Sequence, residues 1–154
     1  MRKYLIFTAI VALVIATLIL PLAASAGPPD SATMKFGRPD LGSGCSFPCD
    51  DDASFHAVDK VAPGSVAISA GGSVTFEMNG FHQVAIYEPG IKPRDIEPNI
   101  ITFPFLNDED GRIFLGGLQV DETFTFEEPG KYLVLCNITP HFEEAQMWGW
   151  VIVN

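Results

Sequence analysis

Short segments of alternating polar and apolar residues, separated by turn residues, dominate the chain after residue 56. The alternation is clearest in residues 73–78 and 122–126, where every second side chain is apolar, as in a half-buried strand. The turn signal Asn79-Gly80 closes the first of these segments. Further strands are expected at 65–68, 83–87, 131–135 and 148–153. The spacing predicts an all-β domain, a β-sandwich over residues 56–154.

The first 26 residues have the composition of a secretory signal. Arg2 and Lys3 form a positive start, residues 5–20 are apolar, and Ala24-Ser25-Ala26 is a small-residue cleavage site. The apolar run is also close to the length that spans a bilayer, so an uncleaved membrane anchor stays open as an alternative. Under both interpretations we expect the rest of the chain to be exported, to the periplasm or to the cell exterior.

The charge of the chain excludes one class of partner. Nineteen acidic residues stand against nine basic ones, which gives a formal net charge of -10. Binding of nucleic acid needs a basic surface, so we expect no nucleic-acid partner. The acidity fits a basic partner protein drawn in by long-range attraction, although it also serves solubility alone. We expect a monomer.

Residues 27–55 are rich in glycine, proline, serine and aspartate, and we expect an irregular lead-in there. This segment contains Cys45 and Cys49, two of the three cysteines of the chain. A disulfide between them fits export and leaves Cys136 unpaired. The alternative is a second metal site that combines the same pair with His56.

Three side chains that bind soft metals lie within twelve residues near the end of the chain: Cys136, His141 and Met147. A thiolate, an imidazole and a thioether together favour copper, and two histidines, one cysteine and a weak axial methionine make a blue-copper site. The second histidine must come from elsewhere. His82 follows a turn and precedes an expected strand, so it can lie at the same end of the sandwich, whereas His56 precedes an irregular stretch.

Two segments of the chain resemble the plastocyanin/azurin-like cupredoxins. The segment from Val74 to Val84 is similar to their first ligand region. The run that leads into Cys136, and the residues from there to Asn154, resemble their ligand loop and closing strand. The resemblance covers roughly residues 60–154. It implies a Greek-key β-sandwich with one type 1 copper and single-electron transfer rather than enzymatic catalysis. The implied ligands are His82, Cys136, His141 and Met147.

The ligand loop departs from the family in the spacing before its last ligand and in the residue that should hydrogen-bond to it. One extra residue precedes Met147, which makes Gln146 an alternative axial ligand. Gln83 stands where the family usually has an asparagine that ties the two ligand loops together. The connection over residues 88–112 is longer than in a minimal member.

The resemblance leads us to expect a transient redox protein as partner. We expect His141 to lie near the surface as the exit for electrons, because Pro140 and Phe142 flank it in a loop. Two other functions stay open. One is copper binding or delivery without electron transfer, and the other is a red-copper catalytic variant that uses Glu143 or Glu144.

Overall fold

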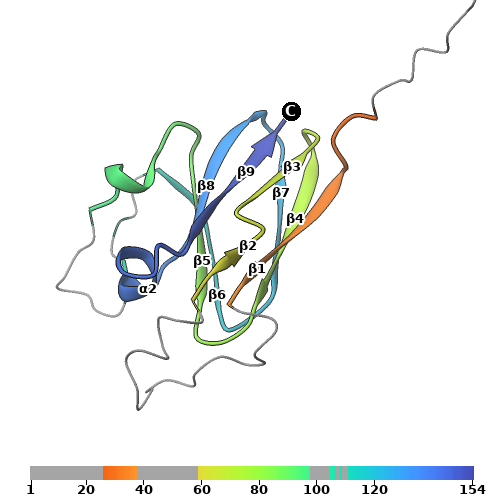
Figure 1. Ribbon diagram of the computed structural model, residues 1–154. Coiled ribbons are helices and arrows are strands. Elements are labelled where there is room, and N and C mark those ends of the chain that lie inside the picture. The colour runs from red at the N-terminus through yellow and green to blue at the C-terminus, as the bar shows by residue number, and fades with distance from the viewer. Residues whose placement is uncertain (1–25, 38–58, 98–104, 107, 109–110) are drawn as a thin grey trace, which may run out of the picture.

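The computed structural model describes residues 26–37, 59–97, 105, 106, 108 and 111–154. Residues 1–25 of the expected signal segment lie outside the described residues, and so do Cys45, Cys49 and His56 with the disulfide and the second metal site considered for them. Two β-sheets face each other, and the helical parts are short (Figure 1). No helix in the described ranges is long and apolar enough to cross a membrane.

The sandwich consists of a four-stranded and a five-stranded sheet. The four-stranded sheet has the order β2 (Val61–Ala62), β1 (Ser31–Phe36), β4 (Gly72–Met78), β7 (Glu122–Phe126). The five-stranded sheet has the order β3 (Ser65–Ile68), β9 (Trp148–Val153), β8 (Gly130–Cys136), β5 (Gln83–Tyr87), β6 (Arg112–Leu118). The helical pieces are η2 (Pro93–Asp95) and α2 (Thr139–Glu143). The prediction of an all-β sandwich is confirmed, and the six predicted strands agree with the structure to within one residue at each end.

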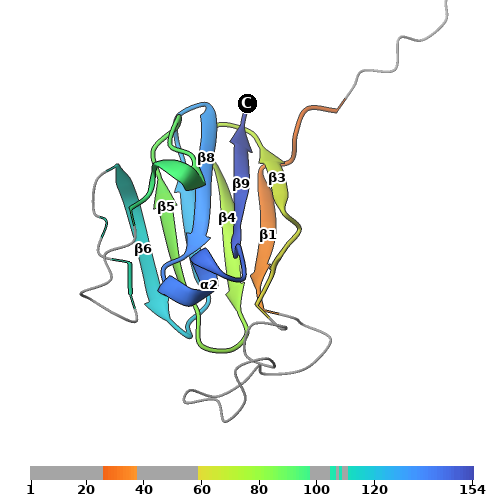
Figure 2. The same ribbon diagram turned by 60° about the vertical axis from the view of Figure 1, so that its left-hand side comes forward.

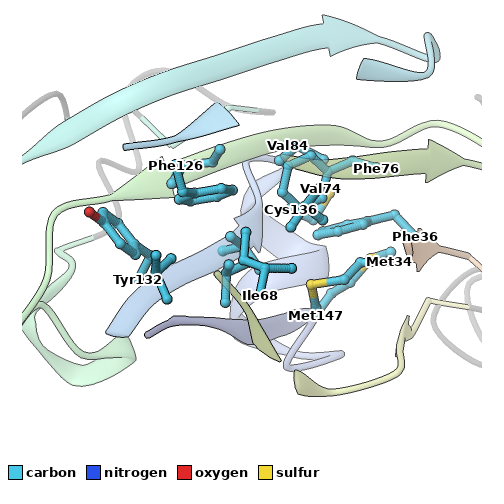
Figure 3. Close-up of a cluster of buried hydrophobic side chains, with 14 of the residues drawn as sticks. Met34, Phe36, Ile68, Val74, Phe76, Val84, Phe126, Tyr132, Cys136 and Met147 are labelled. Carbon is cyan, nitrogen blue, oxygen red and sulfur yellow. The ribbon is translucent and has the colours of Figure 1, made fainter. Parts of the chain in front are cut away.

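Alternation along the strands produces the core between the two sheets. Val74 and Phe76 of β4 point inward and are fully buried, and Phe126 of β7 joins them. Val84 and Cys136 contribute from the five-stranded sheet, so side chains of both sheets interdigitate (Figure 3). Packing of two inner faces in this way is the usual core of a sandwich. The candidate metal-binding cysteine is thus part of the core itself.

Strand β1 corrects the prediction that residues 27–55 are irregular. Ser31–Phe36 pairs with β4 in parallel over its whole length and with β2 at its end. Met34 and Phe36 are fully buried, and the Phe36 ring meets that of Phe76 edge to face at 6.1 Å. The segment alternates like a strand, but prolines and glycines on both sides conceal the pattern. The sandwich therefore begins before residue 56.

Strand β6 is a second element that the sequence did not predict. It lies at the edge of the five-stranded sheet, where β5 is its partner among the described strands. Gly116 and Gly117 interrupt its alternation and resemble a turn signal, although glycines also occur within strands. The connection before β6 contains η2 and comes back to the ligand loop. There Phe105 pairs with Ile138, and the Leu106 amide donates to the carbonyl of Asn137.

Candidate metal centre

Neighbouring strands bring the predicted ligands together at one end of the five-stranded sheet. His82 immediately precedes β5 and Cys136 ends β8, and these two strands pair with Val84 opposite Cys136. His141 comes from α2, which lies beside the end of β8 (Figure 2). A histidine 54 residues before Cys136 thus becomes its neighbour.

Three donor atoms of these residues form a small triangle. The Nδ1 atoms of His82 and His141 are 3.1 Å apart. The Sγ atom of Cys136 lies 3.7 Å from the first and 3.5 Å from the second. A point equidistant from the three atoms is about 2.0 Å from each, close to the roughly 2.0–2.3 Å of zinc–nitrogen and zinc–sulfur bonds. The three side chains therefore fit a single metal ion. Among the described residues, they form the cluster of histidine, cysteine and acidic side chains that could hold one.

All three side chains are buried. His82 is 2% exposed, and His141 and Cys136 are fully buried. The prediction that His141 lies near the surface is wrong. The loop after Cys136 forms a helical turn in which the Phe142 amide donates to the carbonyl of Ile138, and this turn directs the His141 ring inward.

Asp59 is a site residue that the sequence reasoning missed. Its Oδ1 lies 3.5 Å from Nε2 of His82, and its Oδ2 lies 3.4 Å from Nε2 of His141. The carboxyl group thus contacts both imidazoles on the side away from the thiol, and it is only 3% exposed. No motif surrounds Asp59. It lies in the stretch after His56 that we expected to be irregular, so only its burial in the folded chain reveals it.

Burial governs the ionisation of the site. It raises the pKa of the Cys136 thiol to about 12, although backbone hydrogen bonds with Gln83 and Ile138 oppose the rise. Burial also lowers the pKa of His82 to about 4 and raises the pKa of Asp59 to about 7. His82 is therefore neutral at pH 7, so its contact with Asp59 is a polar contact and not an ion pair. Neutral imidazole is the form that binds metals.

The structure separates the two axial candidates. Met147 is fully buried and belongs to the same core cluster as Cys136 (Figure 3). Its backbone carbonyl accepts the Cys136 amide at 2.9 Å, and its amide donates to the carbonyl of His141. Gln146 is exposed and has a positive φ of 52°. The extra residue of the loop is accommodated by this left-handed turn, and Met147 stays on the inner side.

A hydrogen-bonded bridge connects the two ligand segments. The side-chain amide of Asn137 donates to Oε1 of Gln83 at 2.9 Å. The backbone amide of Asn137 donates to the backbone carbonyl of Gln83 at 2.6 Å. Arg112 of β6 donates to Oδ1 of Asn137 at 3.4 Å. Gln83 therefore ties the loops together, as the resemblance implied for an asparagine at that position.

Two acidic residues of the ligand loop do not join the cluster. Glu143 and Glu144 are both exposed, whereas the three donor atoms are buried. The carboxylate that lies beside the cluster is instead that of Asp59, and it contacts the outer nitrogens of the histidines.

Solved structures with the same architecture exist. A dithionite-reduced auracyanin from the photosynthetic bacterium Roseiflexus castenholzii matches with a TM-score of 0.54 and 18% identity, over 83% of this chain and 99% of that chain. The chain has the cupredoxin fold. A plastocyanin from Dryopteris crassirhizoma (TM-score 0.45, 21% identity, 80% and 100% of the two chains) and a pseudoazurin from Hyphomicrobium denitrificans (0.46, 21%, 80% and 75%) also match. No protein-family model matches this cupredoxin-fold chain, and no curated protein matches it.

Proposed function

We propose that this chain is an exported blue-copper protein that binds one type 1 copper and carries single electrons between redox partners. The observation that carries the proposal is the triangle of Cys136 Sγ and the Nδ1 atoms of His82 and His141. A thiolate and two imidazoles in one plane are the equatorial donors of a blue-copper site. Bound copper would supply a one-electron couple at this position.

Met147 is the axial ligand in this proposal. It is buried beside Cys136, whereas Gln146 is exposed. A thioether is also the softer donor, and a soft donor suits the copper–thiolate pair.

The support of the donors favours electron transfer. The His82 amide donates to the carbonyl of Gly80, and the His82 carbonyl accepts the amide of Gln119. Cys136 is held by the Met147 carbonyl, and the bridge between Gln83 and Asn137 links the two segments. Donors fixed in this way need little rearrangement when the oxidation state of a metal changes, so the site suits a carrier of electrons. We further propose a monomer that meets its partner transiently, and the acidic charge of the chain favours a basic partner.

Spectroscopy of the copper-loaded protein tests the proposal. We expect an intense visible thiolate-to-copper band with Cu(II), bound copper at one ion per chain, and a reversible one-electron wave in voltammetry. Cys136→Ser is expected to abolish the band because it removes the thiolate. A colourless Cu(II) form of the unaltered chain would overturn the proposal. A coloured form that exchanges copper rapidly with a chelator and has no reversible wave would point to copper delivery instead.

A further inference from the structure

The Asp59 carboxylate lies between segments that belong to different sheets. Asp59 precedes β2, which is held to the four-stranded sheet by the pairing of Val61 with Phe36. The Gly37 amide also donates to the carbonyl of Lys60 at 2.9 Å. The two imidazoles that Asp59 contacts come from the other sheet and its ligand loop. The position of the carboxylate is thus set independently of the strands that carry the metal-binding atoms.

The two carboxylate oxygens are divided evenly between the two rings. Oδ1 faces Nε2 of His82 and Oδ2 faces Nε2 of His141, at 3.5 and 3.4 Å. The His82 ring also has a hydrogen bond with the backbone of Asn79, so at His82 the carboxylate adds to a backbone partner. A neutral imidazole carries one N–H group, and an acceptor beside one nitrogen draws the proton to that nitrogen. An acceptor at Nε2 therefore leaves the lone pair on Nδ1. In both rings Nδ1 is the atom that faces Cys136.

We propose that Asp59 is a positioning residue that holds both histidines in the Nε2–H tautomer, so that both Nδ1 lone pairs and Cys136 Sγ converge on one cation. This inference rests on the proposed copper site. Carboxylate partners of this kind fix the orientation of a ligand histidine and raise its basicity. Cu(II) is the harder ion and depends more on imidazole than Cu(I) does, so Asp59 stabilises the oxidised form more than the reduced form.

Asp59→Asn tests the inference with little change in shape. Asparagine has one acceptor oxygen and one NH₂ group, so one of the two rings loses its acceptor oxygen at position 59 and faces a donor there. The expected loss of Cu(II) affinity, measured by chelator competition, is about 10- to 100-fold, with a smaller loss for Cu(I). Each tenfold change in the ratio of the two affinities raises the reduction potential by about 59 mV.

Two further variants complete the comparison. Asp59→Glu keeps two acceptor oxygens on a longer side chain, so we expect it to restore part of the affinity that Asp59→Asn loses. Asp30→Asn makes the same substitution at an exposed position before β1 and should leave both affinities unchanged. Equal affinities and potentials for Asp59→Asn and the unaltered chain would overturn the inference.

Nitrogen NMR of the metal-free full chain gives a readout that does not depend on copper, because no metal bound at Nδ1 then decides the tautomer. We expect Nε2–H in both rings of the unaltered chain, and a change in at least one ring with Asp59→Asn. Copper could give no visible band while both rings hold Nε2–H and Asp59→Asn lowers the affinity for Zn(II). In that case the proposed function fails and the role of Asp59 stands. Nδ1–H rings in the unaltered chain would overturn the role of Asp59, whatever the colour of the copper form.

Discussion

The two sheets contribute to the candidate metal centre in different ways. The five-stranded sheet and its ligand loop carry His82, Cys136 and His141, which lie at the end of paired strands. The four-stranded sheet carries no member of this triangle, but its edge holds Asp59 against the outer nitrogens of both histidines. One sheet thus supplies the donor atoms, and the other packs against them and supports their orientation. Substitutions in the core of the four-stranded sheet should therefore lower stability, whereas substitutions around the ligand segments should also change metal binding.

The largest effect is expected from Phe36→Ala in β1. Phe36 is fully buried and packs against Phe76, and truncation of such a ring costs about 3–5 kcal/mol in the free energy of unfolding. Denaturant unfolding of the metal-free chain measures this loss. Thr33→Ala on the exposed face of the same strand is the control and should change stability by about 0.5 kcal/mol or less. Equal stabilities of the two variants would contradict the inclusion of β1 in the core.

A medium effect is expected from Asn137→Ala, which breaks the bridge within the five-stranded sheet. Asn137 is 2% exposed, and its loss leaves the Gln83 side chain without this donor. Gln83 is half-buried, so loss of the hydrogen bond costs about 0.5–1.5 kcal/mol. We expect that loss in denaturant unfolding together with weaker copper binding, because the two ligand segments are no longer tied.

A double-mutant cycle isolates the bridge from the other roles of Asn137. Gln83→Ala alone and Gln83→Ala with Asn137→Ala complete the cycle, and a coupling of about 0.5–3 kcal/mol is expected for residues in contact. Additive losses would mean that the hydrogen bond at 2.9 Å does not join the two segments.

The smallest effect on stability is expected from Met147→Leu, because a swap of similar volume costs less than about 1.5 kcal/mol. The same substitution should clearly change the metal site. We expect a shift in the reduction potential and a changed electron paramagnetic resonance spectrum, because the thioether is lost. Met34→Leu is the matched control, since Met34 is equally buried in the same cluster. Gln146→Ala should leave the spectrum unchanged. A spectrum that responds to Gln146→Ala and not to Met147→Leu would exchange the roles of these two residues.

Local patterns in the sequence were sufficient for most of the strands. The alternation in β4 and β7 predicted which side chains face the core, because a strand directs successive residues to opposite faces. Three donors in one loop, from Cys136, His141 and Met147, indicated a metal site once a second histidine could reach them. The place of His82 ahead of a strand made it the expected second histidine, and the pairing of β5 with β8 brings it to Cys136.

Only the tertiary structure revealed the addition of β1 to the sandwich, the inward direction of His141 and the contact of Asp59 with both rings. Each of these three features depends on contacts between residues far apart in the sequence. The hydrophobic period of a segment cannot predict such contacts, because it reports only which face of that segment is apolar. β1 pairs with β4 across a separation of 42 residues, from Ser31 to Ser73. Asp59 has no pattern around it, and it becomes part of the site because β2 at the edge of one sheet holds it against the ligands of the other.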